Sequence, residues 1–239
     1  MNITENMRLA TVLRRSRYLL LDFDGPVCSV FAGYTASKVA AELRQLIARQ
    51  GFQVPTKVRE TDDPLEVLRY TPSLNKPDLT SEVEEVLRNM ELAAIESATP
   101  TPSLSNVLRA AHRTNRTLTI VSNNSTEAIL TYLTQHNLTT HFAAVIGRYS
   151  GMDPGLLKPS KHLIDEALVR IGAPHSSTVL VGDSSSDIEA AHSASIASIG
   201  YANKPGKQTE LVAAHADAVV NDMATLGDMI NRSPTDSGL

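Results

Sequence analysis

The chain has 239 residues, of which 42% are hydrophobic and 20% are charged, and its formal net charge is −4. This balance excludes disordered, collagen-like and low-complexity chains, and the length allows one or two domains that bury a core without disulfides. The slight acidic excess does not favour a nucleic-acid surface, although it leaves a local basic patch open, and stacking on single strands is disfavoured because only 4% of the residues are aromatic. We therefore expect no nucleic-acid partner.

The chain contains one cysteine, Cys28, which excludes an intrachain disulfide and a metal site built from several cysteines. We interpret Cys28 as a small residue beside the first strand. No apolar run approaches the roughly 20 residues of a membrane span, and the run at 18–21 is too short for the core of a signal peptide. We expect a cytoplasmic protein with no membrane partner.

Short apolar runs predict six strands, at 18–21, 118–122, 143–147, 178–181, 197–200 and 218–220. Apolar residues spaced three and four apart predict helices between most of them, at 104–112, 126–136, 160–171 and 187–193. Strands that alternate with helices favour right-handed crossovers and a parallel sheet covered on both faces. The predicted fold is therefore α/β, a doubly wound parallel sheet that binds ligands at the carboxyl ends of its strands.

Residues 32–97 do not follow this alternation, because they contain helical patterns and no strand. The predicted helices are 35–50, 63–70 with Asp62 or Asp63 as N-cap, and 80–97 with Thr80 or Ser81 as N-cap. We predict an α/β core domain of residues 1–31 and 98–239, into which an all-helical domain of residues 32–97 is inserted.

Two of the predicted strands end in pairs of carboxylates. Asp22 and Asp24 follow the first strand, and Asp183 and Asp187 follow the strand at 178–181. Each pair alone has an ordinary alternative. For the first pair it is a strand-ending turn whose aspartates cap a helix, and for the second it is a helix capped by Asp183 or Ser184 with Asp187 in its first turn. A calcium-binding loop fits the first pair poorly, because a third early ligand is missing and the loop would not end in a glutamate.

Two further strand ends carry phosphate-binding chemistry. Ser122 ends the second predicted strand and Asn123 follows it just before a helix, and Lys158 precedes the helix at 160–171. Alone, the serine fits a helix N-cap and the lysine fits a solvated surface. A parallel sheet, however, brings all these strand ends to one edge. Oxygen ligands from several acids suit Mg²⁺, while the hydroxyl and the lysine suit a phosphoryl group.

These four clusters, in this order, resemble the motifs of the haloacid dehalogenase superfamily of phosphotransferases. The segment Asp22-Phe23-Asp24-Gly25-Pro26-Val27 looks like the DxDx(T/V)(L/V) motif of that family, with Pro26 as a departure. Ser122 matches the hydroxyl of the second motif, Lys158 the lysine of the third, and Gly182-Asp183-xxx-Asp187 the fourth. The resemblance covers residues 15–31 and 98–232. The insertion has the position and helical character of the type C1 cap of that family.

The resemblance implies a role for each residue that matches a motif. These residues are Asp22 and Asp24 for catalysis, Ser122, Asn123 and Lys158 for the substrate phosphate, and Asp22, Asp24, Asp183 and Asp187 for Mg²⁺. Asp22 would be the nucleophile that forms an aspartyl-phosphate, and Asp24 the general acid and base whose backbone carbonyl also binds the metal. Asp187 would be either a metal ligand or a group that orients Lys158 or a metal-bound water.

The expected function is a Mg²⁺-dependent phosphomonoester hydrolase that acts on a small phosphorylated metabolite and resembles phosphoglycolate phosphatases. A phosphomutase keeps both aspartates, but its cap histidine has no match within residues 32–97. A phosphonate hydrolase or a dehalogenase lacks the second aspartate, which is present here as Asp24. The alternative from another class is a phospho-aspartate receiver module. Receivers, however, carry the acceptor aspartate on a later strand than the acidic pair and lack an inserted helical segment.

Overall fold

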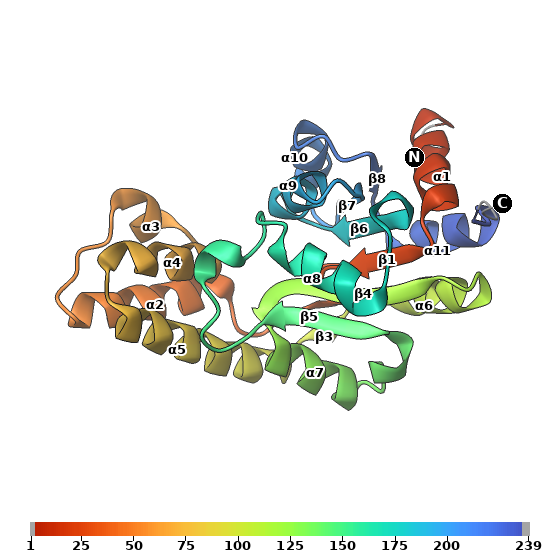
Figure 1. Ribbon diagram of the computed structural model, residues 1–239. Helices are drawn as coiled ribbons and strands as arrows, with labels where there is room; N and C mark the ends of the chain where they lie inside the picture. Colours follow the sequence, from red (N-terminus) through yellow and green to blue (C-terminus); the bar gives the residue numbers. More distant parts are fainter. Residues whose placement is uncertain (1–2, 236–239) are drawn as a thin grey trace.

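The computed structural model describes residues 3–235 (Figure 1). Six strands form a parallel sheet in the order β5–β4–β1–β6–β7–β8, and two short strands form a separate antiparallel pair. The large sheet contains β1 (Tyr18–Leu21), β4 (Thr117–Ser125), β5 (Ala144–Arg148), β6 (Thr178–Gly182), β7 (Ala197–Tyr201) and β8 (Ala218–Val220). The pair is β2 (Cys28–Ser29) and β3 (Thr99–Pro100).

The described residues form eleven α-helices. They are α1 (Ile3–Arg15), α2 (Ala36–Arg49), α3 (Thr56–Glu60), α4 (Pro64–Tyr70), α5 (Pro77–Ile95), α6 (Leu104–Arg113), α7 (Thr126–Gln135), α8 (His162–Ile171), α9 (Ser185–Ser193), α10 (Lys207–Ala213) and α11 (Met223–Arg232). Short 3-10 turns are η1 (Thr71–Leu74), η2 (Thr139–His141), η3 (Pro154–Leu156) and η4 (His175–Ser177). Within residues 3–235, none of the helices is both long and apolar enough to cross a membrane.

Both faces of the large sheet are covered, because successive residues of a strand point to opposite sides. Leu19 and Leu21 of β1 pack in a core with residues of α1, α6, α7 and α11. Leu20 between them packs in a second core with residues of α8 and α9. This arrangement confirms the predicted doubly wound α/β fold.

The six predicted strands all occur, and the main difference lies in β4. This strand was expected to end at Ser122, but it continues to Ser125. Its pairing with β5 shifts register after Val121 and resumes where Ser125 lies opposite Arg148. The predicted strand end is therefore an irregular extended stretch, whose side chains are buried between neighbouring elements.

The helices α2 to α5 lie between β2 and β3 in the chain. Asp63 caps α4 as one of the two expected residues, because its carboxylate accepts a hydrogen bond from the Leu65 N–H at 2.8 Å. The prediction for the last helix was wrong at its start. Helix α5 begins at Pro77 instead of near Thr80, because proline lacks the N–H that the first helical position does not need.

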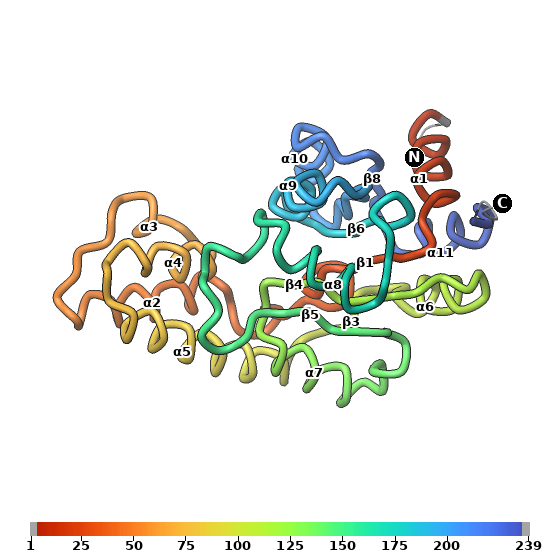
Figure 2. The backbone as a smooth tube through the Cα atoms, in the orientation of Figure 1, coloured from red at the N-terminus to blue at the C-terminus, as the bar shows by residue number. Residues whose placement is uncertain are grey.

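Helix α5 connects the helical segment to the sheet (Figure 1). Near its middle, Val83 and Leu87 pack in the core that contains residues of α2 and α4. At its end, Ala94 and Ile95 pack in the core beneath β1 and α6. The loop after β5 also runs up to the helical segment (Figure 2), where Arg69 of α4 donates a hydrogen bond to the carbonyl of Lys158. The segment therefore stands over the carboxyl ends of the central strands.

Candidate active site

A cavity of about 700 Å³ lies at the carboxyl ends of β1, β4 and β6, beneath the helical segment. All seven site residues predicted from the sequence line this cavity. They are Asp22, Asp24, Ser122, Asn123, Lys158, Asp183 and Asp187. The helical segment contributes further lining residues, including Asp63, Arg69 and Glu91. The parallel sheet thus brings together motifs that are up to 165 residues apart in the chain.

Lys158 is the cation at the centre of this cavity. Its Nζ lies 2.9 Å from Oδ1 of Asp22 and 2.5 Å from Oδ1 of Asp187, and it also donates to the carbonyl of Val121 at 3.0 Å. Burial by itself would lower the pKa of Lys158, but the two carboxylates outweigh it and raise that pKa above its ordinary value. Lys158 therefore stays charged and neutralises part of the acidic cluster.

The carboxyls of the first motif are hard to ionise in this protein. Burial raises the pKa of Asp22 to about 7, against the opposing effect of Lys158. Burial likewise raises the pKa of Asp24 to about 6, while a hydrogen bond from the Val30 N–H at 2.9 Å lowers it. Such values near neutrality suit groups that gain and lose protons during a reaction.

Asp183 completes the acidic cluster from the end of β6. Burial raises its pKa to about 6, and Asn203 donates a hydrogen bond to its Oδ2 at 2.9 Å. A Cβ on Gly25 would lie 2.6 Å from the carboxyl carbon of Asp183, and the φ of Gly25 is +99°. Glycine is therefore required here, both for its backbone conformation and for the close approach of the carboxylate.

This cluster has the donor set of a site for a hard divalent cation. Oxygen atoms of Asp22, Asp183 and Asp187 all lie within 4.8 Å of one another. Asn203 donates to one of these carboxylates, and its own Oδ1 is buried without a hydrogen-bond partner among the described residues. Several carboxylate oxygens in one cluster fit a cation that prefers oxygen ligands.

Asp187 has two structural partners besides its place in the acidic cluster. Its Oδ2 accepts from the Ser184 N–H at 3.0 Å, and Ser184 Oγ accepts from the Asp187 N–H, which forms a capping box at the start of α9. Its Oδ1 faces Lys158. The helix-capping interpretation of this motif is therefore correct, and the same carboxylate also reaches the cavity.

Asn123 joins β4 to the loop that carries Lys158. Its Oδ1 accepts from the Lys158 N–H at 2.8 Å, and its Nδ2 donates to the Lys158 carbonyl at 3.1 Å. Ser122 donates its hydroxyl to Oδ1 of Asn124 at 3.1 Å. The N-cap of α7 is Ser125, so Ser122 is not the helix cap that the alternative interpretation required.

Sequence reasoning missed several residues at this site. Glu91, Arg148 and Asn203 lie outside the motifs but contact them, and Asn124 lies inside the second motif but had no predicted role. Glu91 and Arg148 are 1% exposed, although charged residues in helices and at strand ends are ordinarily solvated. No local sequence signal distinguishes these residues from solvated polar residues.

Cys28 is fully buried in β2, in agreement with its interpretation as a small residue near the first strand. Burial raises the pKa of its thiol above the ordinary value, so the reactive thiolate form is disfavoured.

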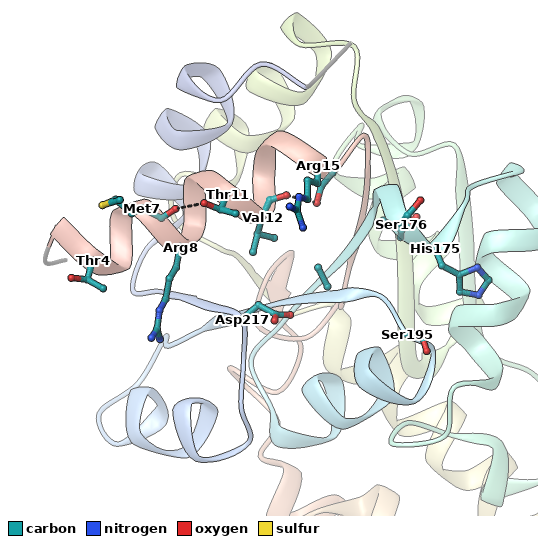
Figure 3. A pocket seen from close by; sticks show the side chains of 13 residues that line it. Thr4, Met7, Arg8, Thr11, Val12, Arg15, His175, Ser176, Ser195 and Asp217 are labelled. Carbon is teal, nitrogen blue, oxygen red and sulfur yellow. Dashed lines mark hydrogen bonds between the residues drawn. The ribbon is translucent and has the colours of Figure 1, made fainter. Parts of the chain in front are cut away.

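A second cavity, of about 690 Å³, lies at the opposite edge of the sheet beside α1 (Figure 3). Thr178 and Ala197, the first residues of β6 and β7, line it together with Arg8 and Asp217. None of the seven predicted site residues lines it. The chemistry of the chain therefore identifies the cavity at the carboxyl ends as the candidate active site.

Curated relatives match part of this chain. A phosphoglycolate phosphatase of Vibrio vulnificus (strain YJ016) is 27% identical over 129 residues, which are 54% of this chain and 55% of the relative. A second phosphoglycolate phosphatase, of strain CMCP6, is 26% identical over the same shares. The chain thus spans about half the length of the curated relatives it matches.

Solved structures share the whole fold at low sequence identity. A predicted phosphatase from Clostridium acetobutylicum superposes with a TM-score of 0.69 at 18% identity, over 90% of this chain and 98% of that one. A mutant of CbbY from Rhodobacter sphaeroides, solved with xylulose-1,5-bisphosphate, gives a TM-score of 0.64 at 15% identity, over 89% and 96%.

The model of one protein family matches most of the chain. Residues 42–201 match the model described as haloacid dehalogenase-like hydrolase. This span includes the second, third and fourth motifs, and the geometry above places the first motif beside them. The family expected from the four motifs is confirmed: the chain belongs to the haloacid dehalogenase-like hydrolases.

Proposed function

We propose that the protein is a Mg²⁺-dependent phosphatase that hydrolyses a small phosphorylated metabolite through an aspartyl-phosphate on Asp22. The observation that carries this proposal is the position of Lys158 Nζ, 2.9 Å from Asp22 and 2.5 Å from Asp187 in a cavity that Asp24, Ser122 and Asp183 also line. A nucleophile, an acid, a phosphate-binding cation and a cation site are then within one cavity. Phosphoglycolate is the first substrate to test, because two curated relatives bear that activity in their names.

Asp22, Asp183 and the backbone carbonyl of Asp24 are the groups that would hold Mg²⁺. The bound ion would neutralise charge between the attacking carboxylate and the phosphoryl oxygens. We assign Asp187 to the orientation of Lys158, because its two oxygens already accept hydrogen bonds from Lys158 and Ser184. Ser122 and Lys158 would hold the phosphoryl oxygens, and Asn123 would hold Lys158 in place.

The reaction divides into two displacements at phosphorus. In the first, an Asp22 oxygen attacks phosphorus, the bond to the leaving oxygen breaks, and Asp24 gives that oxygen its proton. In the second, Asp24 takes a proton from water as the water oxygen attacks phosphorus and the bond to Asp22 breaks. The pKa of Asp24, about 6, allows it to serve as acid and then as base. The helical domain of residues 32–97 would exclude bulk water and select the leaving group.

Rapid-mixing kinetics with an aryl phosphate and Mg²⁺ test this proposal. An aryl leaving group needs little protonation, so Asp24→Asn should release one equivalent in a burst and then turn over slowly. Asp22→Asn should show no burst, and a chelator should abolish wild-type turnover until Mg²⁺ is restored. A burst retained in Asp22→Asn would show that another residue is the nucleophile, and full activity after chelation would exclude the metal.

A further inference from the structure

A buried ionic cluster lies next to the second motif and is not used in the proposed reaction. Arg148 at the end of β5 places its Nε 3.1 Å from Oε1 of Glu84 and its Nη2 2.8 Å from Oε2 of Glu91, both on α5. The three side chains are 1%, 6% and 1% exposed. Burying such charges has a large desolvation cost, and replacing a buried ion pair with well-packed apolar residues is often neutral or stabilising. The cluster therefore calls for an explanation beyond stability.

The two glutamates differ in what else they touch. Glu91 accepts two more hydrogen bonds from the second motif, from Nδ2 of Asn124 at 3.2 Å and from the backbone N–H of Ser125 at 3.0 Å. The hydrogen bond to Glu84 in the described structure comes from Arg148. Arg148 itself donates to the carbonyl of Asn123 at 2.8 Å. Glu91 and Arg148 together therefore hold three consecutive residues of β4.

These contacts reach the hydroxyl of Ser122 through Asn124. A carboxylate can only accept hydrogen bonds, so Glu91 requires Asn124 to present its Nδ2. The Oδ1 atom of Asn124 must then face the other way, where it accepts from the Ser122 hydroxyl at 3.1 Å. The backbone N–H of Asn124 donates back to Ser122 Oγ at 3.3 Å. The carboxylate of Glu91 thus determines where the Ser122 hydroxyl lies.

We propose that Glu91 is a positioning residue through which helix α5 of the inserted segment fixes Ser122 Oγ, by way of Asn124, at the place from which the hydroxyl turns away from Asn124 Oδ1 and donates to a phosphoryl oxygen of the substrate. This inference rests on the proposed function, in which Ser122 contacts the phosphoryl group. The inserted segment then helps to build the phosphate-binding loop that it covers. Arg148 donates hydrogen bonds to both oxygens of the Glu91 carboxylate, which holds that carboxylate where it orients the Asn124 amide.

The pair Glu91→Gln and Glu84→Gln separates positioning from stability. Both changes remove one negative charge from the same arginine on the same helix. Only Glu91→Gln places an amide NH₂ where β4 needs an acceptor. Affinity for inorganic phosphate, with Mg²⁺ present, is measured by calorimetric titration and by competitive inhibition of aryl phosphate hydrolysis, alongside thermal unfolding. We expect phosphate affinity to fall about 10- to 100-fold in Glu91→Gln and less than about 2-fold in Glu84→Gln, at similar loss of Tm.

Asn124→Leu is the second variant, since it removes the amide without changing the charge cluster. It should weaken phosphate binding by a similar factor, even if Glu91→Gln fails to fold. Equal phosphate affinity in the two glutamine variants, or wild-type affinity in Asn124→Leu, would overturn the positioning role alone. A wild-type protein that neither hydrolyses aryl phosphates nor binds phosphate would overturn the proposed function, and the positioning role with it.

Discussion

At the scale of single residues, the site buries several carboxyl groups next to one lysine, and each of these charges would be unfavourable if it were buried alone. Asp22, Asp24 and Asp183 have pKa values of about 7, 6 and 6, because burial opposes their ionisation. The cation of Lys158 lies within 3 Å of two carboxylates of the cluster, Asp22 and Asp187. The remaining negative charge of the carboxylates favours a bound cation, and Lys158 together with that cation would attract the negative phosphate.

Arg69 offers this cavity a second cation, from the helical segment. Its Nη2 donates to the carbonyl of Lys158, while its Nε is buried without a hydrogen-bond partner among the described residues. A guanidinium that lines the same cavity as Lys158 suits a substrate with a second anionic group.

We predict that Arg69→Met lowers kcat/KM about 10- to 100-fold more for phosphoglycolate than for an aryl phosphate that has no carboxylate. Methionine keeps an apolar stem of similar length, so the substitution removes the guanidinium and changes the exposure of the cavity to solvent little. Steady-state kinetics with both substrates measure the ratio, and loss of the Lys158 contact cancels in it. If kcat/KM fell equally for both substrates, Arg69 would only support Lys158 and would not bind the carboxylate of the substrate.

At the scale of elements, the turn from β6 into α9 is where backbone and side chains are most tightly matched. A Cβ on Gly182 would lie 2.3 Å from the carboxyl carbon of Asp187, a distance that real contacts do not show. The capping box at the start of α9 holds that carboxylate in place, so it cannot move aside without loss of the helix cap.

Gly182→Ala should therefore lower kcat/KM by about 100-fold or more, because Asp187 must shift and Lys158 loses its orientation. Gly172→Ala is the matched control. It has a φ of +63° and open space around its Cβ, so it should reduce stability by about 1 kcal/mol and leave kcat unchanged. Thermal unfolding and steady-state kinetics of both variants check the pair. Wild-type activity in Gly182→Ala would mean that Asp187 does not orient Lys158.

At the scale of the whole molecule, the raised pKa values make stability depend on pH. A carboxyl whose pKa is higher in the folded state favours folding in its protonated form. Its contribution to stability is fully present below the pKa of the unfolded state, 3.8 for Asp183, and is lost as pH rises through about 6. Asp22 behaves in the same way up to about pH 7. The ionised carboxyls of the site therefore destabilise the metal-free protein at neutral pH and above.

We predict that metal-free Asp183→Asn is more stable than the metal-free wild type at pH 8, by on the order of 1 kcal/mol, and that the difference vanishes near pH 4. Mg²⁺ at pH 8 should raise the Tm of the wild type much more than that of the variant, since only the wild type keeps the full ligand set. Calorimetry across this pH range measures both effects. A difference that grows toward low pH would have the opposite sign and would contradict the assignment.

The sequence by itself determined the class of fold and the seven residues that come together in the candidate active site. Apolar runs that end in Asp22, Ser122 and Asp183 specify parallel strands whose polar ends meet, because a parallel sheet places all carboxyl ends at one edge. The predicted strands β1 and β8 have the bounds seen in the structure. Such signals lie in short stretches of the chain, so a single sequence is enough to recognise them.

Only the tertiary structure decided how the helical segment takes part in the site. Glu91 lies 57 residues from Arg148 in the chain, and nothing in the helical pattern of α5 distinguishes it from a solvated glutamate. The extension of β4 through Asn124 likewise depends on pairing with β5 and on a carboxylate from another part of the molecule. Burial turns these ordinary polar residues into positioning groups, and burial depends on which elements pack together, which no local pattern encodes.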